Sequence, residues 1–159
     1  MFYKIGFFVL LALLIAAGWV FMRANPMKNE GAASWTEFYS DAPSDTMKFL
    51  NDNFGITSEK YKEAEENGIN YYSLKAKGQF WPFAGVMDMP TLPDGTKVPP
   101  HTMVYLTVKD YDATHAKIIA DGAKPLLTDE YAAGMKFGIY EIPGGLRIGI
   151  AQYGVKKPE

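Results

Sequence analysis

The chain has 159 residues, with 16 Lys and Arg against 18 Asp and Glu, and 48% of its residues are hydrophobic. This length suits one ordinary domain with a single core. The basic residues are scattered, so the chain lacks the electrostatic footprint of a nucleic-acid-binding protein, and the absence of cysteine excludes disulfides, thiolate metal sites and cysteine nucleophiles.

The N-terminal segment is apolar and carries no charge over residues 6–22. As a helix this run approaches the thickness of the hydrocarbon core of a bilayer, and Tyr3 and Trp19 suit the two interfaces. Small residues at 16–18 are compatible with signal cleavage, but the apolar run continues beyond them. The pattern therefore favours a retained membrane anchor over a cleaved signal helix.

The boundaries of this segment follow from the change in composition. We expect residues 1–24 to form the membrane segment, with residues 3–22 contacting the membrane, and the polar residues 25–33 to form a linker. Lys4 precedes the apolar run and Arg23 follows it, so the positive charges barely distinguish the two orientations. The short N-terminal flank favours an exported domain, and a domain on the cytoplasmic face stays the alternative.

The remaining residues contain one pattern of strand, helix and further strands twice. In the first copy residues 35–40 alternate as a strand, Ser44 can cap a helix over 45–53, and Gly55 can end it, with Phe54 expected on the buried helix face. About 68 residues later the pattern returns, as a strand over residues 103–108, an Asp110 or Asp112 cap, a helix over 113–121 and Gly122 after it. Strand-like runs follow each helix, at residues 70–76, 81–89, 125–129, 136–142 and 146–153. Residues 58–67 fit either an exposed helix or an edge strand.

The sequence WTEFYSDAPSDTMKFLNDNFGI opens the first copy, and the second contains PPHTMVYLTVKDYDATHAKIIADGAKPL and GMKFGIYEIPGGLRIGIAQYG. In this order and spacing, these motifs resemble the vicinal-oxygen-chelate superfamily of glyoxalases, bleomycin-resistance proteins and dioxygenases. The resemblance covers residues 34–154. It implies an α+β fold in which two βαβββ modules form a half-barrel cup that holds the site. Because the superfamily builds such cups within one chain or between two, a homodimer is an open possibility.

Many members of this superfamily hold a divalent metal in the cup through His and Glu on four strands. The resemblance places three of these positions on Trp35, Met103 and Gly149, none of which is a ligand for such a cation. The fourth falls within residues 81–89, where Asp88 is the only candidate. We therefore expect this domain to hold no metal and no other cofactor.

Strand alternation predicts which side chains share the cup. If Trp35 and Met103 face the cup, the side chains two residues further along each strand do so as well, and a shift of one residue would exchange both sets. The predicted ligand-binding residues are Trp35, Glu37, Tyr39, His101, Met103, Tyr105 and Arg147.

Glu37 is the most informative of these residues, because a carboxylate among apolar strand neighbours needs a partner. Either Arg147 or another cation pairs with it as a structural bridge, or it reads a ligand or transfers a proton, or it faces solvent. His101 is expected near the rim and inert, and His115 on a solvated helix face. Residues 79–83 form an aromatic cluster that fits either the core or the cup wall.

The favoured function is a membrane-anchored or exported module that binds an unknown small molecule without a metal. One alternative is a metal-assisted lyase, isomerase or dioxygenase of the same superfamily, using Asp88 with Glu37 or His101. The other is a non-catalytic, membrane-tethered interaction domain whose cup is filled by its own aromatic side chains. No phosphate-binding loop or nucleophile elbow is present, and the sequence identifies no catalytic residue.

Overall fold

The computed structural model describes residues 29–66, 68–89 and 99–158. The predicted membrane segment, residues 1–24, and residues 25–28 of the predicted linker lie outside this part of the chain. Among the residues that are described, no helix is long and apolar enough to cross a membrane.

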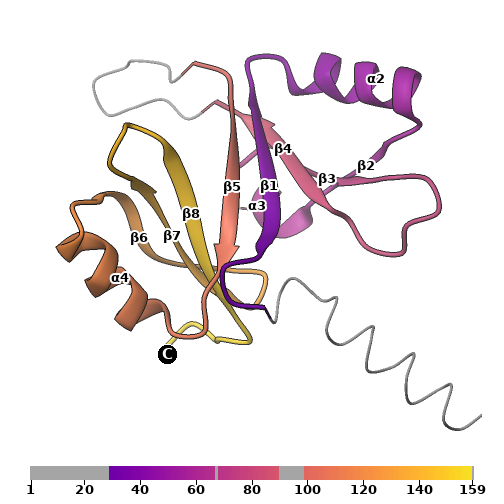
Figure 1. The fold of residues 1–159 in the computed structure, drawn as a ribbon. Coiled ribbons are helices and arrows are strands. Elements are labelled where there is room, and N and C mark those ends of the chain that lie inside the picture. Colours follow the sequence, from indigo (N-terminus) through magenta and orange to yellow (C-terminus); the bar gives the residue numbers. More distant parts are fainter. Residues whose placement is uncertain (1–28, 67, 90–98, 159) are drawn as a thin grey trace, which may run out of the picture.

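Two modules of strands and helices follow one another along the chain (Figure 1). The first consists of β1 (Ala33–Ser40), α2 (Pro43–Phe54), β2 (Thr57–Lys60), α3 (Lys62–Glu66), β3 (Tyr71–Lys75) and β4 (Ala84–Asp88). The second consists of β5 (His101–Thr107), α4 (Tyr111–Ala120), β6 (Lys124–Ala132), β7 (Met135–Glu141) and β8 (Arg147–Tyr153). Residues 58–67, left ambiguous by their sequence, contain both an edge strand and the short helix α3.

All eight strands belong to one sheet, in the order β2-β3-β4-β1-β5-β8-β7-β6. In each module the last strand lies parallel to the first, β4 beside β1 and β8 beside β5, and the modules join where β1 pairs antiparallel with β5. The predicted α+β fold of two repeated modules is therefore confirmed, with α3 as an addition to the first.

The long helices cover one face of the sheet, one helix for each module (Figure 1). Met47 and Leu50 of α2 pack against Leu74 and Val86. In the second module, Ile118 and Ile119 of α4 pack against a cluster that includes Tyr140 and Ile150. We call this the convex face, and the opposite face the concave face. The apolar spacing that predicted both helices is thus satisfied by packing on the convex face.

The start of α2 differs from its prediction, whereas its end agrees. Pro43 occupies the first turn and Ala42 is the N-cap, without a side-chain capping bond, so Ser44 is not the cap. Proline suits this position because its missing N–H would have no partner inside the helix. Gly55 ends α2 in the left-handed conformation, as expected. Phe54 is 65% exposed and not buried, and its ring instead contacts that of Phe49 edge-on.

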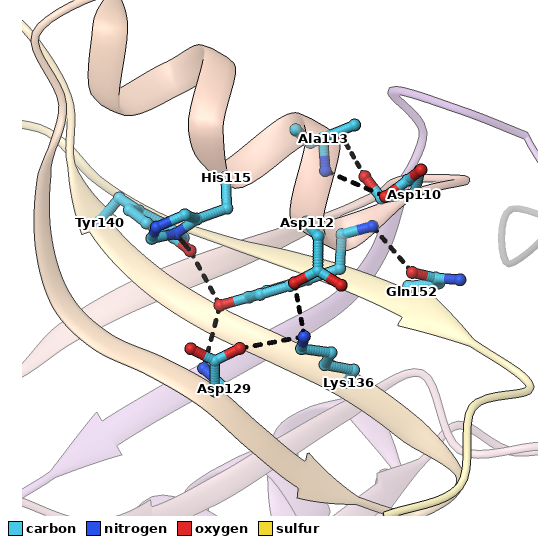
Figure 2. Close-up of polar contacts among 10 residues, drawn as sticks. Asp110, Asp112, Ala113, His115, Asp129, Lys136, Tyr140 and Gln152 are labelled. Carbon is cyan, nitrogen blue, oxygen red and sulfur yellow. Dashed lines mark hydrogen bonds and ion pairs between the residues drawn. The ribbon is translucent and has the colours of Figure 1, made fainter.

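The start of α4 is capped by Asp110, whose carboxylate accepts the backbone N–H of Ala113 at 3.0 Å. Beneath this helix a chain of hydrogen bonds crosses to β6 and β7 (Figure 2). The Tyr111 and Tyr140 hydroxyls lie 2.9 Å apart, and Nδ1 of His115 lies 2.8 Å from the Tyr140 hydroxyl. The expected solvated position of His115 is therefore wrong, since its ring is half-buried and bonded.

Lys136 secures the same region from the strand side (Figure 2). Its ammonium group lies 2.6 Å from the Asp112 carboxylate and 3.0 Å from that of Asp129, and it sits over the Tyr111 ring. Gly138 leaves space for the two tyrosines, because a Cβ at this position would meet both hydroxyls. This polar cluster fixes α4 on the convex face, away from the candidate site.

Candidate functional site

The pairing of β1 with β5 places the predicted residues on one face of the sheet. Trp35 lies opposite Tyr105, Glu37 opposite Met103, and Tyr39 opposite His101. Alternation therefore directs all six side chains to the concave face, and the predicted sharing of that face is confirmed.

The carboxyl group of Glu37 lies at the floor of this face, and the residue is only 9% exposed. The Tyr39 hydroxyl donates to its Oε2 at 2.7 Å, and the Tyr105 hydroxyl donates to the same oxygen at 2.9 Å. The Tyr71 hydroxyl, from β3, accepts the Trp35 indole N–H at 2.8 Å, and it lies close enough to the carboxyl group to lower the pKa of Glu37. We call these three residues, Tyr39, Tyr71 and Tyr105, the tyrosine triad.

Burial raises the pKa of Glu37 above its ordinary value. The tyrosine hydroxyls and the electrostatic effect of the nearby His101 lower this pKa, but they offset the cost of desolvation only in part. Burial also raises the pKa of each tyrosine in the triad, and the adjacent Glu37 raises it further. At neutral pH the three hydroxyls therefore remain protonated and able to donate.

Arg147 does not neutralise Glu37. It is exposed at the start of β8, and the ion pairs found within the described residues include none between Arg147 and Glu37. The ion pair between Arg147 and Glu37 that was considered from the sequence is therefore wrong. The partners of Glu37 are neutral tyrosine hydroxyls, which sequence reasoning missed for Tyr71 because its strand assignment did not fix its face.

Two glycines make room for side chains of the tyrosine triad. Gly85 on β4 lies opposite Glu37, and Gly149 on β8 lies opposite Tyr105, at equivalent places in the two modules. A Cβ at Gly85 would overlap the Tyr71 hydroxyl, and one at Gly149 would overlap the Tyr105 ring. The glycines are thus a steric condition for placing these rings against the sheet.

The metal positions implied by the superfamily can now be tested against the chemistry of the donors. Three fall on Trp35, Met103 and Gly149, and the equivalence of the modules places the fourth on Gly85. Asp88, the candidate from the sequence, pairs with Ser40 and points to the convex face, because it is three residues from Gly85. None of the four positions carries a metal ligand, and no group of three or more His, Asp and Glu able to hold an ion occurs in the described part of the chain. These residues do not fit a divalent metal.

The rest of the concave floor is apolar and aromatic. Met103 is 1% exposed and Tyr105 3% exposed, and they form one cluster with Tyr39 and Ala151. The surrounding side chains are Trp35, Met87, Met89, Met135, Phe137, Ile139 and Tyr153. The His101 ring stacks on that of Tyr39, with centroids 4.5 Å apart. Glu37 is thus an acidic group in an otherwise apolar surface, bounded by a histidine.

The aromatic residues at 79–83 fit neither of the two expectations. Phe80 is 82% exposed and Trp81 is 69% exposed, so they belong neither to the core nor to a closed cup wall. They border a groove of about 210 Å³, lined by Glu59, Ser73, Lys75, Phe80, Trp81 and Pro82. This groove lies at the edge of the first module, beside the turn between β3 and β4.

No protein-family model and no curated protein matches the sequence. Solved structures do match, among them a Streptomyces coelicolor methylmalonyl-CoA epimerase variant in complex with 2-nitronate-propionyl-CoA, with 14% identity, a TM-score of 0.54, and coverage of 80% of this chain and 100% of that chain. The Mycobacterium tuberculosis methylmalonyl-CoA epimerase has 15% identity, a TM-score of 0.54, and coverage of 79% and 91%. A Legionella pneumophila structure described as an NAD-dependent benzaldehyde dehydrogenase has 10% identity, a TM-score of 0.50, and coverage of 74% and 96%.

At these identities the likeness concerns the fold and leaves the activity open. Methylmalonyl-CoA epimerase is a vicinal-oxygen-chelate protein, so the superfamily fold expected from the motifs is supported by these neighbours. The described part of the chain has the fold of the methylmalonyl-CoA epimerases.

Proposed function

We propose that this chain is a membrane-tethered module that binds a small molecule on the concave face, without a metal, through Glu37 and the tyrosine triad. The observation that carries the proposal is a buried carboxyl group whose partners are neutral hydroxyls. An ionised carboxylate in such surroundings is costly until a cation reaches it. A cluster that stabilises its own fold alone would be better served by apolar side chains in place of Glu37 and its tyrosine partners together, or by a complete ion pair.

The surroundings of Glu37 favour an organic cation with an apolar body. A cationic group would compensate the carboxylate, and the half-buried ring of Trp35 offers a π-face that attracts cations. Solved neighbours in complex with coenzyme A derivatives support a small molecule as the general class of ligand on this fold. The sign of the charge at Glu37 distinguishes the ligand proposed here from those anionic compounds.

The binding proposal is tested by titrating the full chain, held in detergent micelles or nanodiscs, with a panel of aliphatic and aromatic amines and quaternary ammonium compounds. We expect saturable changes in tryptophan fluorescence that persist in the presence of a chelator. Glu37→Gln should weaken the best compound about tenfold to a hundredfold, because a hydrogen bond or contact to a charged group contributes about 1.5–3 kcal/mol.

The matched control for this titration is Asp88→Asn, which removes a carboxylate from the convex face and should leave the affinity unchanged. Equal affinities for the Gln variant, the Asn variant and the parent chain would contradict a role for Glu37 in binding. If no compound binds the parent chain, the filled-cup interaction domain becomes the better account, consistent with the nearly complete burial of Met103 and Tyr105.

A second candidate is a metal-free isomerase in which Glu37 transfers a proton to or from a carbon acid. The raised pKa of Glu37 favours it, because a general acid or base works best with a pKa near the operating pH. The solved neighbours that are epimerases support the same direction. Incubating the full chain with methylmalonyl-CoA in D₂O distinguishes the candidates: deuterium incorporation that Glu37→Gln abolishes would favour the isomerase.

A further inference from the structure

β1 and β4 begin at the same edge of the sheet, where edge means the row of strand ends and not an outermost strand. These strands run parallel, with Thr36 beside Ala84, so the residues that precede each strand project from one edge. The residues before β1 lead back to the predicted membrane segment, and those before β4 include Phe80 and Trp81. We call the row of strand ends where β1 and β4 begin the tether edge. Figure 1 shows β1 and β4 side by side in the sheet.

Two large aromatic side chains are displayed at the tether edge. Phe80 and Trp81 are 82% and 69% exposed, and their rings meet edge-on with centroids 5.2 Å apart. Such an exposed apolar pair is typical of a surface that contacts another phase or molecule. Tryptophan and phenylalanine in particular suit the boundary between lipid headgroups and acyl chains.

The ends of β5 and β8 belong to the same edge. The Thr107 N–H donates to the Ala32 carbonyl at 2.9 Å, and the Tyr153 hydroxyl donates to that of Ser34 at 3.0 Å. The residues after β8 therefore leave from the tether edge, and they include the exposed Lys156 and Lys157.

Other lysines add to the positive charge of this edge. Lys75 and Lys77 belong to the end of β3 and to the turn that carries the aromatic pair. The carboxylate of Glu30 lies 2.9 Å from the Lys109 ammonium group, so that acid is paired. Aromatic side chains with lysines around them match the two parts of an anionic lipid surface, its acyl boundary and its phosphates.

We propose that the tether edge docks on the membrane that holds residues 3–22, with Phe80 and Trp81 entering the lipid interface and the lysines contacting anionic headgroups. The inference rests on the membrane tether of the proposed function. Residues 23–28 separate the apolar run from the described domain and reach roughly 20 Å when extended, which keeps the domain close to the lipid surface. Docking would fix the orientation of the concave face relative to the membrane.

The test uses the full chain reconstituted in vesicles of phosphatidylcholine and phosphatidylglycerol. Because the chain contains no cysteine, single Cys variants accept the environment-sensitive fluorophore NBD at one position each. Gln79→Cys reports on the turn, and Leu146→Cys is the matched control, since Leu146 is also exposed but precedes β8 at the opposite edge. We expect a blue-shifted emission and several-fold stronger quenching by doxyl lipids at position 79 than at position 146.

The double substitution Phe80→Ser/Trp81→Ser should reduce the quenching at position 79 to the control level. Lys156→Glu/Lys157→Glu should reduce it in anionic vesicles only. If the protein floats with the vesicles but both probes are quenched equally, docking is overturned while the tether stands. If the protein does not float, the tether and the docking both fail. A blue shift at position 79 without doxyl quenching would assign this surface to contact with a second copy of the chain and overturn the lipid assignment.

Discussion

Glu37→Leu should lower the free energy of unfolding by about 2–6 kcal/mol, because it leaves the Tyr39 and Tyr105 hydroxyls without their acceptor in a buried setting, at about 1–3 kcal/mol each. Leucine fills a similar volume, so a large loss reports the missing hydrogen bonds and not a cavity. Urea denaturation of the full chain in detergent measures the difference. A Leu variant as stable as the parent chain would show that the carboxyl group is dispensable for the fold.

Glu37→Gln is the control for this change, since one amide oxygen can accept both tyrosine hydroxyls. The raised pKa of Glu37 also sets the sign of the pH dependence. Between its ordinary and its raised pKa, the folded chain binds more protons at this group than the unfolded chain does, so the stability of the parent chain falls as pH rises through that window. The Gln variant lacks this loss, and its stability relative to the parent chain should increase across the same window.

Gly149→Ala should destabilise the domain by about 2.5–6 kcal/mol. The added Cβ overlaps the Tyr105 ring, and overpacking typically costs about 1–3 kcal/mol. Displacing that ring also breaks its hydrogen bond to Glu37, which adds about 1.5–3 kcal/mol because the acceptor is a carboxyl group. Chemical denaturation of the parent chain and the variant measures the loss.

The cause of this loss can be isolated with a second substitution. Tyr105→Leu removes the ring that the new methyl group meets, so Gly149→Ala should cost much less in that background than in the parent chain. Additive losses in the double variant would contradict steric conflict with Tyr105 as the mechanism and would indicate a backbone effect at Gly149.

The modules and the shared face of Trp35, Glu37 and Tyr39 could be predicted because they depend on local periods. A strand alternates every two residues, and Gly55 and Asp110 act on the helix termini next to them. These signals do not require knowledge of what lies across the sheet. The same reasoning placed Met103 and Tyr105 together on β5.

The errors arise where a residue's role depends on distant partners. The face of Asp88 depends on how many residues the turn before β4 contains, and the sequence does not fix that number. Arg147 was a plausible partner for Glu37 by charge, but hydroxyls from three strands surround the carboxyl group instead. Phe80 and Trp81 were expected in either the core or the cup wall because they are aromatic, although they are exposed on a turn.

The pKa of Glu37 in the folded chain is the most direct test of a buried, metal-free carboxyl site. Carbon-13 NMR of labelled glutamate side chains, assigned with Glu37→Gln, gives its titration midpoint. We predict a midpoint above the ordinary value, a further increase in Tyr105→Phe because one stabilising hydrogen bond is lost, and a decrease when a cationic ligand binds. A midpoint at or below the ordinary value, unchanged by Tyr105→Phe, would contradict the account and indicate a solvated or ion-paired Glu37.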